Sequence, residues 1–166
     1  MFLIKIKMLI SDALELATIA YDDALKFRLK HPDALFFDCE GEDVQFYSCI
    51  IDEKLIIVFR GSSSLEDFVA DANFLQSSVP REISMTSGIK CHTGFLNQFM
   101  AALPALVKIL GTCENDVVVI GHSLGGALAT LCAMSIKCGS LKSPRNVNCI
   151  TFGSPRVGNS LFVKES

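Results

Sequence analysis

Residues 117–131, VVVIGHSLGGALATL, constrain the fold of this chain more than any other segment. Four β-branched residues lead into a Gly-x-Ser-x-Gly turn, and small residues follow it, so a buried strand should turn sharply into a helix. Side chains in place of Gly121 and Gly125 would collide with the neighbouring strand or helix. Ser123, at the apex, would then lie at a helix N-terminus, where the helix dipole and a free N–H favour an oxyanion. The pattern predicts a nucleophile elbow; the alternative is a strand–helix turn that merely contains a serine.

A catalytic triad needs a base and an acid besides the nucleophile. In folds with this elbow they follow the serine in the order Asp or Glu, then His. After Ser123 the sequence contains no histidine, and its one acidic residue is Glu165. The Asp and His of a triad are therefore not present in this chain. We expect either a fragment or truncated product, or a site that is built in an unusual way.

The rest of the chain alternates between helical and strand patterns. A helix should begin at Ser11 or Asp12 and run to about Lys30, and residues 44–51 and 55–59 should form a hairpin. Residues 94–110 should form a helix that Pro104 kinks or restarts, and residues 147–152 a further strand. Nearly continuous apolar strands between helices indicate a mainly parallel sheet that is covered on both faces.

Composition indicates one domain and argues against several kinds of partner. The 166 residues are half apolar, enough for a core, and the net charge of −3 without a basic cluster argues against nucleic acid. The seven cysteines lack metal-ligand spacing and favour a reducing compartment. Lys5 and Lys7 interrupt the first apolar run, unlike the charges of a signal peptide, which precede it. We therefore expect a cytoplasmic protein, with membrane-surface association as the alternative and secretion less favoured.

Four sequence blocks together resemble the class 3 lipases, the fungal triacylglycerol lipase-like α/β-hydrolases. They are IIVFRGSSS at 56–64, HTGF at 92–95, GHSLGGALA at 121–129 and TFGSPRVGN at 151–159. The resemblance implies a three-layer α/β-hydrolase fold, with a sheet between helices. It covers about the N-terminal three-fifths of the family's catalytic domain. Residues 1–166 would then be a single partial domain, truncated at its C-terminus.

The resemblance also implies roles for residues near the elbow. Backbone N–H groups of Ser62 and Leu124 would form the oxyanion hole. Residues 63–73 resemble the family's lid, in which an amphipathic helix covers the serine in water and moves aside at a lipid surface. In this segment Asp71 matches an acid that hydrogen-bonds the oxyanion serine when the lid opens, and the apolar positions are Leu65, Phe68, Val69 and Ala72. The alternative is an ordinary surface helix packed on the core.

None of the three histidines is expected to be the missing base. His122 is adjacent to Ser123, so the two side chains should point apart, and in the family this histidine is structural. His92 lies in a block that the family uses near the site but not as the base. His31 precedes a proline at a helix end and should be solvated.

The activity implied is hydrolysis of carboxylic esters of acylglycerols or other lipids at a lipid–water interface. Ser123 would attack the ester carbonyl and form an acyl-enzyme that water releases, without a metal or organic cofactor. This chain alone should be weak or inactive and, if truncated, should self-associate. Two alternatives stay open: a catalytically incomplete lipid- or partner-binding pseudoenzyme, and a regulatory pseudoenzyme that keeps the elbow as a packing turn.

Overall fold

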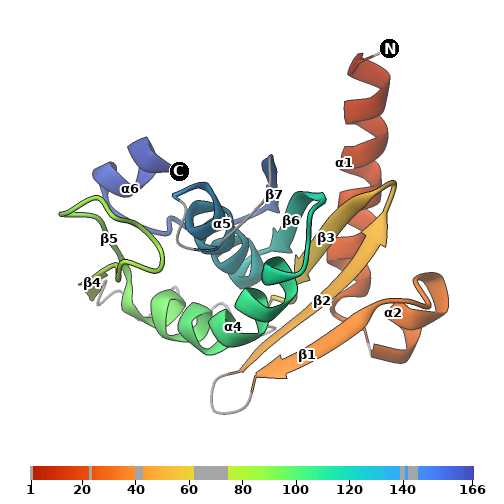
Figure 1. The fold of residues 1–166 in the computed structure, drawn as a ribbon, viewed down its shortest axis with the longest axis horizontal. Coiled ribbons are helices and arrows are strands. Elements are labelled where there is room, and N and C mark those ends of the chain that lie inside the picture. Colours follow the sequence, from red (N-terminus) through yellow and green to blue (C-terminus); the bar gives the residue numbers. More distant parts are fainter. Residues whose placement is uncertain (1, 23, 40–42, 62–74, 139–140, 142–145) are drawn as a thin grey trace.

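The computed structural model describes residues 2–22, 24–39, 43–61, 75–138, 141 and 146–166, with side chains from residue 10 onward. A five-stranded sheet with helices on both faces makes up most of this part of the chain (Figure 1). The elements are α1 (Phe2–Ile19), α2 (Ala24–Lys30), β1 (Leu35–Cys39), β2 (Val44–Ile51), β3 (Lys54–Phe59), β4 (Gln76–Ser78), β5 (Lys90–His92), α4 (Thr93–Gly111), β6 (Asp116–His122), α5 (Leu124–Lys137), β7 (Val147–Phe152) and α6 (Ser160–Glu165).

The main sheet has the strand order β1-β2-β3-β6-β7. β6 pairs in parallel with β3 and with β7, whereas β1 pairs with β2 and β2 with β3 in antiparallel fashion. The sheet is therefore mixed rather than mainly parallel. The predicted hairpin accounts for part of the difference, since Asp52 and Glu53 adopt φ values of 48° and 59° in the tight turn that reverses the chain. The predicted strands 44–51 and 147–152 are confirmed to the residue.

The two faces of the sheet carry separate hydrophobic clusters, as the three-layer prediction requires. On one face α4 and α5 pack over β3 and β6, with Ile57 and Val119 among the buried residues. On the opposite face α1 packs against β3 and β6, with Val58 and Val118 inside, and α2 packs on Tyr47 of β2. Successive residues of a strand point to opposite faces, so a strand covered on both sides has no polar alternation. This explains why β3 and β6 are apolar throughout.

The first helix differs from the prediction at both ends. It begins at Phe2 rather than at Ser11 or Asp12, and it stops at Ile19 instead of continuing to Lys30. Backbone bonds from Tyr21 to Thr18 and from Asp22 to Ile19 tighten the last turn. The break lets α2 place Phe27 on the sheet, where its ring stacks on Tyr47 with centroids 4.1 Å apart. It also directs Tyr21 toward the end of β6.

Helix α4 runs unbroken past Pro104, so the predicted restart is wrong. At 19 residues it is long and apolar enough to cross a membrane by length and composition alone. Its residues Phe95, Phe99 and Leu106 are nevertheless buried against the sheet and α5. The apolar character of α4 is that of a core helix in a folded domain.

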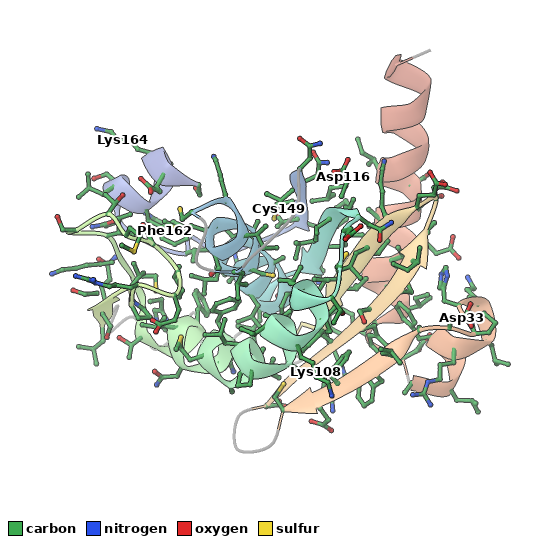
Figure 2. All side chains as sticks on the ribbon, in the orientation of Figure 1. Asp33, Lys108, Asp116, Cys149, Phe162 and Lys164 are labelled. Carbon is green, nitrogen blue, oxygen red and sulfur yellow. The ribbon has the colours of Figure 1, made fainter. Side chains whose placement is uncertain are left out.

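Strand β7 forms one edge of the sheet in the described part of the chain. It pairs with β6 only, and Asn148, Cys149 and Thr151 are exposed. Figure 2 shows Cys149 at this outer edge. An unpaired strand edge with apolar neighbours favours association with another chain. The expected self-association of the isolated chain stays a prediction.

Buried thiols provide a test of the core packing. All seven cysteines are unpaired, and burial raises the pKa of Cys49 and Cys91 to about 11 and also raises that of Cys132. At pH 8 only about one in a thousand thiols with such a pKa is ionised, and the thiolate is the reactive form. We expect iodoacetamide to alkylate these three cysteines at least about 100-fold more slowly in the folded than in the urea-unfolded protein. The half-buried Cys113 is the comparator within the same digest, read by mass spectrometry. Equal rates of alkylation of Cys132 in the folded and the urea-unfolded protein would contradict this core packing.

Candidate active site

The predicted elbow is present between β6 and α5. Ser123 adopts φ 60° and ψ −126°, a left-handed conformation that costs strain for a residue other than glycine. Backbone bonds hold it there: the N–H of Ser123 donates to the carbonyl of Phe152 on β7, and its carbonyl accepts from Gly126, both at 2.9 Å. A strained serine held in this way between a strand end and a helix start matches the geometry of a nucleophile elbow.

The requirement for glycine on both sides of Ser123 is confirmed. A Cβ on Gly121 would overlap the carbonyl of Gly125 and lie 2.7 Å from the nitrogen of Gly126. A Cβ on Gly125 would overlap the carbonyl of Phe59 at the end of β3. Backbone atoms cannot move aside as a flexible side chain can. Close packing of strand against helix therefore depends on the absence of these two side chains.

Helix α5 begins immediately after the serine, with Leu124 as its first residue. The first N–H groups of a helix have no acceptor within the helix and carry the positive end of its dipole. The N–H of Leu124 is therefore available to a negative charge that develops beside Ser123. This position agrees with the role predicted for Leu124, which stays a prediction.

The second predicted oxyanion residue, Ser62, lies outside the described residues, as does the whole predicted lid segment 63–73 with Leu65, Phe68, Val69 and Asp71. The chain just before it is described. Phe59 at the end of β3 pairs in register with Gly121, and a Cβ on Gly61 would lie 2.6 Å from the carbonyl of His122. The chain that leads to Ser62 thus starts directly against the elbow.

The structure adds Tyr21 to the site, a residue for which the sequence predicts only a place within a helix that runs to about Lys30. The Oη of Tyr21 lies 2.8 Å from Nδ1 of His122, and the two rings meet edge to face with centroids 5.7 Å apart. Burial raises the pKa of the Tyr21 phenol, and a hydrogen bond from Ser123 and the positive charge of Arg60 oppose that shift. No sequence signal links residues 21 and 122, because only the tertiary fold brings them together.

Each histidine has a structural contact, and the expectation that none of them is the base stays a prediction. His122 bonds to Tyr21 and not to the serine beside it. Nδ1 of His92 accepts the N–H of Gly94 and caps α4, and His31 packs on the ring of Phe27.

The four resembling blocks come together around the elbow. β3 ends beside Gly121, and β7 ends at Phe152, whose carbonyl holds Ser123. The HTGF block joins the last block through a bond from His92 to the carbonyl of Val157. Blocks far apart in the sequence thus surround a single site. In the same described residues no group of three His, Cys, Asp or Glu side chains could hold a metal ion.

The mixed sheet lies between two helical layers, and a strained serine lies where a parallel strand turns into a helix. This combination defines an α/β-hydrolase. Residues 56–166 match the family model Lipase (class 3), and the chain belongs to that family. The predicted fold class and family are thereby confirmed.

Known proteins similar to this chain include fungal lipases. The lipase of Rhizomucor miehei is 38% identical over 117 residues, 67% of this chain and 31% of the relative. Its propeptide complex superposes with a TM-score of 0.79 at 28% identity, covering 97% of this chain and 57% of that one. "Secreted mono- and diacylglycerol lipase 1" of Fusarium solani is 33% identical over 115 residues, 66% of this chain and 32% of the relative. The chain spans about a third of the length of these curated relatives.

A further solved structure concerns the catalytic centre of a relative. It is described as a serine protease triad forming the catalytic centre of a triacylglycerol lipase, and it is 34% identical to this chain with a TM-score of 0.65. The match covers 78% of this chain and 51% of that one.

The expectation of a cytoplasmic protein is wrong. The Fusarium relative is named a secreted lipase, which points to an extracellular location. The expectation depended on Lys5 and Lys7 in the first apolar run and on the number and spacing of the cysteines, and the cysteines are weak evidence here. Cys91 and Cys132 lie fully inside the core, where a thiol packs as a small apolar group whatever the compartment.

Proposed function

We propose that the protein is a serine lipase that hydrolyses carboxylic esters of acylglycerols or related lipids through an acyl-enzyme on Ser123. The observation that carries the proposal is the strained backbone of Ser123, held at φ 60° between β6 and α5. A turn that serves packing alone would adopt this conformation more easily with glycine at its apex. The lipase names of the relatives support the reaction class and the lipid substrate.

In the proposed reaction Oγ of Ser123 attacks the ester carbonyl carbon, and its proton passes to the triad base. The carbonyl oxygen becomes an oxyanion, and the backbone N–H groups of Leu124 and Ser62 donate to it. Each such donor is typically worth about 3 kcal/mol in the transition state. Collapse expels the alcohol, which takes the proton from the base, and water then releases the acid by the reverse sequence. The relative described with a serine protease triad supports this scheme.

Residues 63–73 are proposed as the lid. Its apolar residues, Leu65, Phe68 and Val69, would cover the serine in water and contact lipid when the segment moves. Asp71 would bond to Ser62 in the open state. Such a lid implies activity at a lipid–water interface, and the secreted Fusarium relative supports an extracellular one.

A second candidate function is lipid binding without catalysis. The observation that favours it is the bond of His122 to Tyr21, which engages the imidazole that is next to Ser123 in the sequence. A chain of this kind would hold an acyl chain or ester near the elbow without cleaving it.

Hydrolysis of an emulsified triacylglycerol by the full-length protein distinguishes the two candidates. We expect turnover that is higher on the emulsion than on the same ester below its solubility limit. The 166-residue chain alone should show turnover at least about 1,000-fold lower, because enzymes without their triad partners keep only the catalysis of the oxyanion hole and binding. Lipid binding by the full-length protein without any hydrolysis would favour the second candidate. Full turnover by the short chain would mean that it contains the base.

A further inference from the structure

We propose that Tyr21 is a positioning residue of the active site: its phenol oxygen holds the hydroxyl of Ser123, and His122 holds the phenol. The inference rests on the proposed function and deepens it. It explains how a histidine that points away from the nucleophile can still affect it.

The position of Tyr21 follows from the break in the first helix. α1 ends at Ile19, and the next backbone bonds turn the chain before α2 starts at Ala24. Tyr21 lies in this turn, on the face of the sheet opposite α5. Its side chain reaches the carboxyl end of β6, where His122 and Ser123 lie.

The phenol oxygen, more than the ring, faces the site. It lies 2.8 Å from Nδ1 of His122, and the hydroxyl of Ser123 is close enough to act on the pKa of the phenol. A Cβ on Gly61 would overlap the same oxygen. The phenol thus contacts both the elbow and the start of the loop that leads to Ser62.

The hydrogen bonds around this oxygen balance in either tautomer of His122. A tyrosine hydroxyl has one proton to donate and can accept others. With Nδ1 of His122 unprotonated, the phenol donates to Nδ1 and can accept from the serine hydroxyl; with Nδ1 protonated, Nδ1–H donates to the phenol, whose proton then points to Oγ of Ser123. When the triad base takes the serine proton, the phenol remains beside Oγ and limits its rotation about Cα–Cβ. Small losses of alignment in a nucleophile can cost up to about 100-fold in rate.

The chain offers a matched control for the loss of a phenol oxygen. Tyr47 is its only other tyrosine, and it lies 1% exposed in the core with its ring stacked on Phe27. Tyr47→Phe should therefore change stability but not the reactivity of Ser123. Tyr21→Phe keeps the ring and its edge-to-face contact with His122 and removes only the oxygen.

The test uses the full-length protein and an alkyl phosphonate that labels the active serine. We expect Tyr21→Phe to slow labelling of Ser123 and to lower kcat by about tenfold, with KM within about twofold and an unchanged cooperative melt. His122→Ala should have a similar effect. His122→Asn, whose Oδ1 can accept at the position of Nδ1, should restore part of the rate. In the Tyr21→Phe background, His122→Ala should add nothing, because it acts through the phenol.

Labelling and kcat at the wild-type level in Tyr21→Phe would overturn the inference and leave the proposed function intact. Additive effects of the two substitutions would also overturn it, since His122 would then act independently of Tyr21. A wild-type protein that turns over lipid esters but is not labelled at Ser123 would instead refute the assignment of the nucleophile, and this inference with it.

Discussion

Ser123→Ala should lower kcat for ester hydrolysis by the full-length protein by roughly 10⁴- to 10⁶-fold and leave the fold unchanged. The hydroxyl is the proposed nucleophile, so no acyl-enzyme can form without it. Alanine keeps the Cβ that already fits at φ 60°, so the backbone of the elbow need not move. Initial rates on a short-chain ester, measured alongside a thermal melt, check both parts of this expectation.

Ser135→Ala is the matched control for Ser123→Ala. Ser135 lies on the same helix, α5, is fully buried, and donates its hydroxyl to the carbonyl of Leu131 at 2.9 Å. Its replacement should cost stability but keep the rate of hydrolysis. A Ser123→Ala protein that retains more than a tenth of the wild-type kcat would exclude Ser123 as the nucleophile.

Gly121→Ala should destabilise the protein by about 3 kcal/mol or more, an effect large enough to prevent folding of a marginally stable domain. The added Cβ would overlap the carbonyl of Gly125 and lie 2.7 Å from the nitrogen of Gly126. To remove this overlap, α5 would have to move away from β6, and this movement would open the core between them. If the variant folds, the midpoint of urea unfolding measures its loss of stability. If it does not fold, the loss shows as a lower yield of folded protein.

Gly111→Ala provides the contrast to Gly121→Ala. Gly111 is the last residue of α4, and a Cβ there would meet no atom within 4 Å. Alanine in a helix is favoured over glycine by up to about 1 kcal/mol, so this variant should be neutral or more stable. Equal stability of the Gly121→Ala and Gly111→Ala proteins would contradict the close approach of β6 and α5.

The elbow could be predicted from sequence because its determinants are local. The β-branched run, the two glycines and the small residues after Ser123 lie within fifteen consecutive positions. β7 was predicted to the residue for a similar reason: a short apolar run follows a loop and precedes another turn. The mixed sheet was not predicted, because β1 reads LFFDC, without strand periodicity, and pairs with β2 only in the folded chain.

The contact of Tyr21 with the elbow could not be predicted, and neither could the helix break that makes it possible. Apolar residues continue at helical spacing from Ala17 through Tyr21 to Ala24, so the periodicity predicts one helix. The burial of Phe27 against Tyr47 stabilises the broken form. Tertiary packing has overridden the local helical pattern. As a result the site gains Tyr21, a residue that none of the four sequence blocks contains.

The most direct test of the account is the position of a covalent adduct on the full-length protein. After incubation with an alkyl phosphonate that mimics the tetrahedral intermediate, the protein is digested and its peptides are sequenced by mass spectrometry. The account predicts one phosphonylated residue, Ser123, in the peptide that joins β6 to α5. An adduct on another serine, such as Ser62 or Ser154, or an active protein without any adduct, would contradict it.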